Sequence, residues 1–238
     1  SEDRVKQVVV TQGLRGLAGQ AVRVDSRRSL KPGRQPHQHR HADLLRRCGH
    51  AIVAQLLERI PKLKVLLALD VEATFLHDVA AESLAEVILC YPGVQCLIHH
   101  RLAHELLRLG APTIFARLIS EISHSKFGID IHPQTTIGHS CFLDHGTGIV
   151  IGATAILGNR VSIYQGATLG AKAFPVDPIT GRKIKSLPRH PIIEDDVVIY
   201  ANATVLGRIT IGRNSVLAGS VWVDRDVPPN SLVAQKPM

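Results

Sequence analysis

The chain has 238 residues, 45% of them hydrophobic and only 4% aromatic, and a formal net charge of +8 at pH 7. This length allows one large domain or two modest ones with a sizeable core. So few aromatic residues disfavour a nucleic-acid-binding protein that stacks bases on its rings. We therefore expect no nucleic-acid partner. No apolar run is long enough to cross a bilayer, so we expect no membrane either. The positive charge still suits a phosphorylated ligand.

Residues 1–41 are predicted to form a basic, flexible N-terminal segment. It ends in SRRSLKPGRQPHQHRH, in which Pro, Gly and charged residues favour loose attachment. The alternating His37, His39 and His41 would suit a metal ion, but no matching group of Cys or His follows, so we predict no metal site. The start SEDRVKQ lacks the pattern of a secretory leader.

The four cysteines, at positions 48, 90, 96 and 141, form no CxxC pair and suggest no disulfide framework. Such usage is typical of a reducing compartment, so we expect a cytoplasmic protein. Cys141 lies two places before an aliphatic position of the repeat described below. We therefore expect it in the core rather than as a nucleophile.

Residues 42–128 are predicted to form an α-helical domain. Apolar residues recur there at steps of three and four, beginning with ADLLRRCGHAIVAQLLERIPKLKVLLALDVEATF. Pro61 marks a boundary or a kink in this first pattern. Pro92-Gly93 and Gly110-Ala111-Pro112 separate the later helices. The helical pattern stops at Gly128.

Residues 129–238 follow a different period. Aliphatic residues recur there every six positions, with a shift of two residues after Ile149 and a break from about 171 to 190. A parallel β-helix has this period, because three units, each a short strand and a turn, close one triangular coil. A β-sandwich with coincidental spacing is the alternative. The predicted inward positions are Ile131, Ile137, Leu143, Ile149, Ile151, Leu157, Ile163, Leu169, Ile193, Ile199, Val205, Ile211, Leu217 and Val223.

Three motifs within this region, IDIHP, LDHGTG and RHP, resemble those of the serine O-acetyltransferase family. The resemblance runs from about Asp78 to about Val233, and this combination is far more specific than hexapeptide repeats alone. It implies an α+β protein in which an N-terminal α-helical domain precedes a left-handed parallel β-helix of hexapeptide repeats. It also implies an enzyme of cysteine biosynthesis that transfers acetyl from acetyl-CoA to the hydroxyl of L-serine, without a metal.

His145, in LDHGTG, is the candidate general base. A histidine can take the hydroxyl proton at neutral pH as the oxygen attacks, and a carboxylate on its far ring nitrogen would fix the tautomer. By resemblance this partner is Asp130, in IDIHP. It precedes His145 by 15 residues, close to the roughly 18 of one coil. The two therefore lie on adjacent coils of one chain or meet between chains of a trimer.

The resemblance also implies a site for serine. Asp144 and Asp78 would hold the serine ammonium, although Val79 stands where the family usually has proline. Arg189 and His190, in PRHP, would bind the serine carboxylate, for which an arginine fork is well suited.

Acetyl-CoA is expected in a groove between the β-helices of neighbouring chains. The resemblance matches Gly170, Ala171, Ala201 and Gly219 to the cofactor-lining positions, where small residues let the pantetheine arm approach the backbone. The insertion at 171–190 is either a lid whose cations meet the CoA phosphates or a solvated loop.

Three other polar residues are given structural interpretations. His132, in IDIHP, is expected to be a corner residue with a local hydrogen bond rather than a metal ligand. Tyr164 and Gln165 lie on the coil that leads to the insertion and are expected to line the pocket.

The resemblance further implies a homo-oligomer, either a homotrimer or a hexamer, with active sites between chains. It suggests feedback inhibition by L-cysteine in the serine site. Many members continue into a tail ending in Ile that docks into O-acetylserine sulfhydrylase. The present sequence ends in SLVAQKPM, so this partner rests on the family alone.

Two alternatives stay open at this point. The first is O-acetylation of a sugar on the same β-helix, but a neutral sugar has no need of charges such as Asp78, Asp144 and Arg189. The second is a non-catalytic hexapeptide scaffold, against which the pair of Asp130 and His145 argues.

Overall fold

The computed structural model describes residues 36–185 and 187–235, with side chains from residue 48 onward. Contacts divide the chain into Ser1–Leu44 and Leu45–Met238. Of the first unit only residues 36–44 are described, as the beginning of a helix. The predicted flexible segment up to residue 35 and the side chains of His37, His39 and His41 therefore lie outside the described part.

Four helices are described before the strands begin. They are α2 (Pro36–His77), α3 (Leu84–Cys90), α4 (Pro92–Arg108) and α5 (Thr113–Phe127). Pro61 lies inside α2, so it does not end that helix. Pro92 begins α4, where a missing backbone N–H costs nothing. Gly128 follows α5 in the left-handed conformation, with φ of 68°, and glycine adopts this conformation readily.

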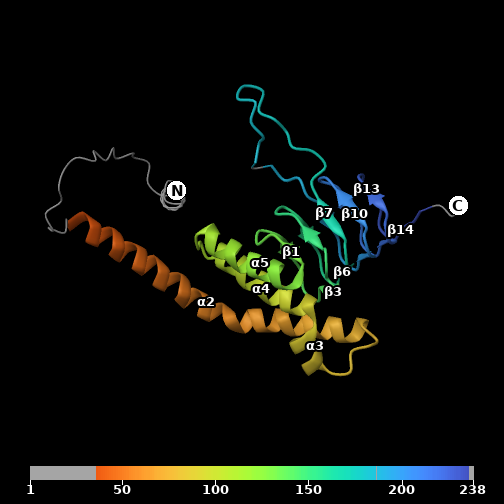
Figure 1. Ribbon diagram of the computed structural model, residues 1–238, viewed down its shortest axis with the longest axis horizontal. Coiled ribbons are helices and arrows are strands. Elements are labelled where there is room, and N and C mark those ends of the chain that lie inside the picture. Colours follow the sequence, from red (N-terminus) through yellow and green to blue (C-terminus); the bar gives the residue numbers. More distant parts are fainter. Residues whose placement is uncertain (1–35, 186, 236–238) are drawn as a thin grey trace, which may run out of the picture. The chain divides into compact units, whose positions relative to one another are not determined.

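The strands that follow form a parallel β-helix with three faces (Figure 1). The first face contains β1 (Asp130–Ile131), β4 (Val150–Ile151), β7 (Thr168–Gly170), β10 (Thr204–Leu206) and β13 (Trp222–Val223). The second face contains β2 (Thr136–Ile137), β5 (Ile156–Leu157), β8 (Ile192–Ile193) and β11 (Thr210–Ile211). The third face contains β3 (Phe142–Asp144), β6 (Ser162–Tyr164), β9 (Val198–Ile199), β12 (Val216–Leu217) and β14 (Leu232–Val233).

The core of the β-helix is a stack of aliphatic side chains. All fourteen predicted inward positions are buried, with relative exposure between 0% and 9%. On the first face, Ile131 is in register with Ile151, which in turn pairs with Leu169. Each coil buries its apolar residues against the next coil, as in other repeat architectures. The prediction of a β-helix is therefore confirmed and the β-sandwich alternative is wrong.

Two edges of this triangular coil matter below. We call the edge where the third face passes to the first the histidine edge; it comprises residues 144–149, 164–167, 200–203 and 218–221. We call the edge where the first face passes to the second the arginine edge; it comprises residues 132–135, 152–155, 171–191 and 207–209.

The insertion at 171–190 belongs to the arginine edge. It leaves the stack after β7 and returns at β8, and Figure 1 shows it as a cyan loop extending from the strands. Its tip is a turn closed by an antiparallel bridge between Val176 and Lys183. The Asp177 carboxylate accepts hydrogen bonds from the N–H groups of Ile179 and Thr180, both at 2.8 Å. The tip of the insertion is therefore a turn with defined backbone hydrogen bonds.

All four cysteines are free thiols. Cys96 and Cys141 are buried, and Cys141 belongs to the hydrophobic core, as predicted. Burial raises the pKa of the Cys141 thiol, and the nearby Asp70 charge adds to this shift. A thiol that stays protonated is a poor nucleophile. Among the described helices, none combines the length and apolarity that a membrane span requires.

Candidate active site

Asp144 and His145 stand together at the first corner of the histidine edge. Asp144 is the last residue of β3, and His145 follows it with a left-handed φ of 54°. The His145 side chain is 72% exposed, that of Asp144 is 17% exposed, and His145 Nε2 lies 3.8 Å from Asp144 Oδ2. This corner therefore presents an accessible imidazole beside a half-buried carboxylate.

Asp130 begins β1 at the same edge. Because Ile131 points inward, Asp130 faces outward, as neighbouring side chains of a strand alternate. The corner is tied to β1 by hydrogen bonds from Gly148 N–H to the Gly128 carbonyl (2.8 Å) and from Asp130 N–H to the Ile149 carbonyl (2.9 Å). Within the described residues no hydrogen bond joins Asp130 to His145. The fold brings the two to one corner, and their direct pairing stays a prediction.

Asp78, directly after α2, supplies a second carboxylate. It accepts hydrogen bonds from the Ala80 N–H and from the Tyr91 hydroxyl, both at 2.8 Å. These bonds, in that order, and the nearby His145 lower the pKa of Asp78, so it is ionised at neutral pH. The same carboxylate raises the pKa of Tyr91 to about 12, with burial and the charges of Glu86 and Asp144 contributing.

The start of α4 places Tyr91 next to β3. A side chain on Gly93 would lie 2.1 Å from the Leu143 carbonyl oxygen, so only glycine allows this approach. Leu143 precedes Asp144, while Tyr91 holds Asp78. The close contact between α4 and β3 thus sets Asp78 and Asp144 on the same side of the site. Two carboxylates at such a point favour a cationic ligand group.

Aromatic rings continue along the third face beside the histidine edge. Phe142 stacks on His77 at 5.6 Å between centroids, and its edge meets Tyr164 at 6.0 Å. Tyr164 in turn stacks on Tyr200 at 5.0 Å. Burial raises the pKa of Tyr164, and the charges of Asp144, Tyr200 and Asp78 add to the shift. The expected position of Tyr164 near the pocket fits this geometry.

The predicted cofactor residues divide between the two edges. Ala201 and Gly219 stack on consecutive corners of the histidine edge, since a side chain on Gly219 would lie 3.3 Å from the Ala201 carbonyl oxygen. Gly170 ends β7 and Ala171 begins the insertion, both at the arginine edge. Gly170 is packed against Leu206, whose Cδ2 lies 2.8 Å from the position that a side chain would take.

Arg189 and His190 lie at the arginine edge, held by Thr154. The Thr154 hydroxyl accepts the N–H groups of Arg189 (2.9 Å) and His190 (3.1 Å). The Thr154 N–H donates to His190 Nδ1 at 3.1 Å, so Nδ1 is an acceptor and the ring proton is on Nε2. Arg208 donates to the carbonyls of Thr154 and His190 and closes this corner.

The Arg189 guanidinium is only partly hydrogen-bonded within the described residues. Its Nη1 donates to the Lys185 carbonyl at 3.1 Å, while its buried Nε has no partner within the described residues. A buried donor without an acceptor is costly. A carboxylate would supply the missing acceptor with good geometry.

The cations of the insertion have different surroundings. Lys172 forms an ion pair with Asp224 at 2.9 Å, and the Lys183 amine lies over the Phe174 ring at 4.8 Å. For Arg182 and Lys185, the described residues supply no carboxylate within ion-pair distance. Of the four cations considered for CoA phosphates, these two are therefore the better candidates.

His132 has the local role expected of it. Its Nδ1 accepts the Gln134 N–H at 3.1 Å, and burial lowers its pKa. Throughout the described part of the chain, no group of three or more His, Cys, Asp or Glu is arranged to hold a metal ion.

Sequence reasoning missed Tyr91, Asp70 and Arg101. Tyr91 stands at a helix start with no pattern around it, and its contact with Asp78 depends on how three elements pack. Asp70 and Arg101 carried a signal, because each occupies a helical position that apolar spacing would assign to the core. A charge at such a position requires a buried partner, and the two residues prove to be partners of each other.

The two halves of the site lie on different edges of the coil. The acidic residues and His145 are at the histidine edge, while Arg189 and His190 are at the arginine edge, with the strands of the first face between them. The histidine edge thus combines carboxylates with an exposed imidazole, and the arginine edge offers donors that suit an anion.

Comparison with known proteins matches this architecture. A family described as bacterial transferase hexapeptide (six repeats) matches residues 190–225. The chain is 56% identical over 178 residues to a plasmid serine acetyltransferase of Synechococcus elongatus, covering 75% of this chain and 55% of that protein. It is 43% identical to a Mycobacterium tuberculosis serine acetyltransferase, covering 71% of this chain and 69% of that protein.

Solved structures agree. Serine acetyltransferase 1 of Entamoeba histolytica in complex with L-cysteine aligns with a TM-score of 0.72 and 41% identity, covering 80% of this chain and 68% of that one. A Neisseria gonorrhoeae serine acetyltransferase in complex with serine aligns with a TM-score of 0.68 and 34% identity, covering 78% and 72%. The chain spans between about half and two thirds of the length of the first curated relatives that it matches.

The fold and its corner residues define a hexapeptide-repeat transferase with a left-handed parallel β-helix. Its identity with full-length relatives is too high, and extends over too much of the chain, to reflect the fold alone. The chain belongs to the serine acetyltransferase family.

Proposed function

We propose that the protein is a serine O-acetyltransferase, which transfers acetyl from acetyl-CoA to the hydroxyl of L-serine and releases O-acetyl-L-serine and CoA. The observation that carries this proposal is the placement of two carboxylates, Asp78 and Asp144, beside the exposed His145. An acceptor with an ammonium group next to its hydroxyl fits this arrangement. A neutral acceptor would leave the two carboxylates uncompensated.

In the proposed mechanism His145 is the general base. It removes the serine hydroxyl proton while the oxygen attacks the thioester carbonyl, and the protonated ring then returns the proton to the departing CoA thiolate. Asp130, at the same corner, would stabilise the protonated imidazole. Asp78 and Asp144 would hold the ammonium so that the hydroxyl points toward His145.

The serine carboxylate is assigned to Arg189 and His190. The unpartnered Nε of Arg189 and the Nε2 proton of His190 are the donors that support this assignment. Because these residues stand on the other edge of the coil, we infer that each site combines the histidine edge of one chain with the arginine edge of its neighbour. A homotrimer, alone or paired into a hexamer, supplies such neighbours.

Acetyl-CoA would lie in the groove between the two chains. Ala201 and Gly219 leave room for the pantetheine arm at the histidine edge, while Gly170 and Ala171 belong to the neighbour's arginine edge. Arg182 and Lys185 are positioned on the insertion, as cations for the phosphates. We assign no role to a metal.

Three further expectations belong to this proposal. L-cysteine is proposed as a feedback inhibitor that competes for the serine site, since it shares the ammonium and carboxylate of serine. O-acetylserine sulfhydrylase is a proposed partner on the basis of the family alone. A cytoplasmic location is proposed from the absence of a disulfide pattern among the four cysteines.

The test is thiol release from acetyl-CoA with L-serine, compared with glucose, galactose and no acceptor. We expect release with serine only. His145→Ala should lower kcat by about 10²- to 10⁴-fold, since this is the usual contribution of a general base. His124→Ala, which removes an exposed histidine from α5, is the matched control and should leave kcat unchanged.

Two results would contradict the proposal. Release with a sugar but not with serine would assign the site to another acceptor. Near-normal turnover by His145→Ala would show that the base is a different residue.

A further inference from the structure

One ion pair is buried where the helices meet the first coil of the β-helix. Asp70, on α2, and Arg101, on α4, are 0% and 5% exposed. Arg101 Nε donates to Asp70 Oδ2 at 2.5 Å, and its Nη2 donates to Oδ1 at 2.8 Å. We call these two residues the clamp.

The clamp also binds the backbone of the β-helix. Arg101 donates to the carbonyls of Ile137 (3.3 Å) and Gly138 (2.7 Å), and Asp70 Oδ1 accepts the Cys141 N–H at 3.0 Å. Each guanidinium nitrogen of Arg101 and both carboxylate oxygens of Asp70 thus have a partner. The pair links α2, α4 and the turn that leads into β3.

Both carboxylates of the proposed ammonium site are short distances along the chain from the clamp. Asp78 follows Asp70 by eight residues, about 12 Å along a continuous helix. Asp144 follows Cys141 by three residues, through the whole of β3. The helix and the strand are rigid elements, so the position of Asp70 relative to Cys141 determines that of Asp78 relative to Asp144.

A contribution to stability does not by itself explain this pair. Burying two charges costs desolvation that their attraction often only offsets, so a buried ion pair is weak evidence of stabilisation. We propose that Asp70 and Arg101 are positioning residues that fix the separation of Asp78 and Asp144 and thereby the affinity for the ammonium of the acceptor. This inference rests on the proposed function and deepens it.

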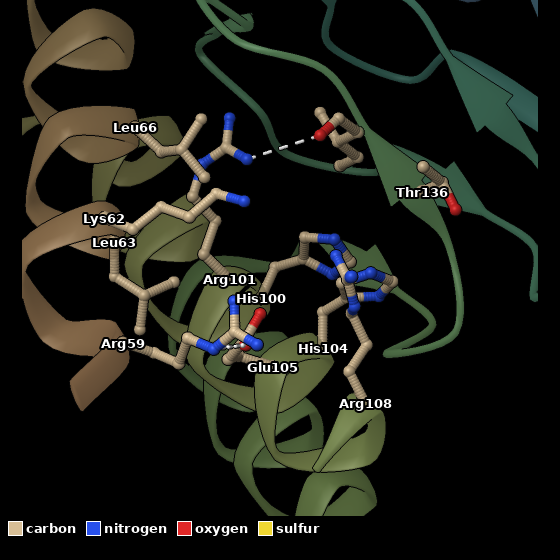
Figure 2. Close-up of a pocket in the computed structure, with 11 residues that line it drawn as sticks. Arg59, Lys62, Leu63, Leu66, His100, Arg101, His104, Glu105, Arg108 and Thr136 are labelled. Carbon is tan, nitrogen blue, oxygen red and sulfur yellow. Dashed lines mark hydrogen bonds and ion pairs between the residues drawn. The ribbon is translucent and has the colours of Figure 1, made fainter. Parts of the chain in front are cut away.

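The surroundings of Arg101 make the clamp depend on Asp70. Figure 2 shows Arg101 at a groove between α2 and α4, with its bond to the β-helix backbone dashed and Lys62 reaching toward it from α2.

Arg59 and Arg108 line the same groove. Glu105 is the one acidic lining residue among those described, and it pairs with Arg59. Without the Asp70 charge, Arg101 would keep only its two carbonyl acceptors against the repulsion of the neighbouring cations, and its link to Cys141 would be lost.

The experiment compares Asp70→Asn with Glu105→Gln in the full chain. Each variant removes one carboxylate from a contact between α2 and α4, but only Asp70 reaches β3. We expect Asp70→Asn to raise the KM for L-serine at least tenfold while the KM for acetyl-CoA stays within twofold. Glu105→Gln should leave both KM values within twofold of those of the protein without substitutions.

A second variant guards against misfolding. Arg101→Lys keeps the charge but loses the fork that holds both Asp70 oxygens and two carbonyls. It should shift the KM for serine in the same direction, with the folded state verified by circular dichroism. A serine KM that stays unchanged in a folded variant of either clamp residue would overturn the inference. If the protein without substitutions does not acetylate serine, the proposed function is overturned, and the inference with it.

Discussion

His190 and His100 are two buried histidines whose rings are neutral at pH 7. Burial lowers the pKa of His190 to about 4, and the charges of Arg189, His132 and Arg208 add to this effect. Burial lowers the pKa of His100 to about 3, with His104 and Arg101 contributing. For His190 this means that the Nε2 proton is present as a neutral donor throughout the physiological range.

These two residues make stability depend on pH. In the unfolded chain histidines take up a proton near pH 6.5, whereas in the folded chain these two do so only near pH 4 or 3. Between these pH values the unfolded state binds more protons than the folded state. The contribution of the two neutral rings to the free energy of unfolding is therefore fully present above about pH 6.5 and falls as the pH decreases. We expect the thermal midpoint to drop between pH 7 and pH 5 at constant ionic strength.

A histidine variant tests this assignment. His190→Gln should show a smaller drop in thermal midpoint over the same range, because one of the two buried rings is gone. His124→Gln, at an exposed position, should keep the full drop. An identical drop in the His190 variant would attribute the pH dependence to other groups.

Sequence analysis succeeded for residues that repeat, because the fourteen buried aliphatic positions follow from periodicity. The LDHGTG motif drew attention to His145, which the structure places at an exposed corner, while its catalytic role stays a prediction. Asp70, Arg101 and Tyr91 act through contacts between separate segments, from 13 residues apart for Tyr91 and Asp78 to 71 for Asp70 and Cys141. Periodicity carries no information about such contacts, although a charge at a core position indicates that one exists.

At the scale of elements, the corner that carries His145 differs from its neighbours in length. Five residues, 145–149, connect β3 to β4, whereas three residues, 165–167, connect β6 to β7. The shift of two residues in the aliphatic period is the trace of this longer corner in the sequence. The shift was visible in the sequence, but the exposure of the imidazole at this corner required the structure.

The corner between β4 and β5 allows a second prediction. A side chain on Gly152 would lie 2.0 Å from His190 Cδ2 and 2.1 Å from its Nε2. Gly152→Ala should therefore displace the ring and raise the KM for L-serine about tenfold, with overpacking costing about 1–3 kcal/mol of stability. Steady-state kinetics and thermal unfolding measure the two effects.

Gly49→Ala is the control for this substitution. Gly49 lies in α2 with nothing within 4 Å of the added carbon. The change should leave both KM values unaltered and stabilise the helix by up to about 1 kcal/mol. A normal serine KM in Gly152→Ala would mean that His190 does not contact the substrate.

Helix boundaries were harder to predict than the strands. Pro61 suggested a boundary or a kink, and the boundary is wrong because α2 continues through it. Whether the chain divides near residue 41 stays a prediction, because the structure describes no side chains there. The approach of α4 to β3 at Gly93 was not predicted, since a glycine after a proline reads as a separator between helices.

At the scale of the whole molecule, the separation of the two edges supports the proposal that each site combines residues of two chains. His145 and Arg189 belong to opposite ends of the first face. Two chains arranged around a threefold axis would bring the histidine edge of one to the arginine edge of the next. Motifs predicted the residues of both halves, but they carry no information about which chain supplies each half.

Mixing two inactive variants tests this arrangement. His145→Ala and Arg189→Ala should each be nearly inactive alone. When they are co-expressed, about one quarter of the interfaces should pair an intact His145 with an intact Arg189, and activity should return in proportion. Variants that are mixed after separate assembly provide the control and should stay inactive. Absence of recovery on co-expression would show that both halves act within one chain.

The regular coils contain the hexapeptide match, whereas the irregular first coil contains most of the acidic site. The hexapeptide match covers residues 190–225, where the coils are uniform, whereas Asp130, Asp144 and His145 all precede it. The coils beyond Gly219 contribute none of the proposed site residues, whereas the first coil and the corner that follows it carry Asp130, Asp144 and His145. We therefore expect the far end of the β-helix to tolerate insertions and deletions better than its first coil.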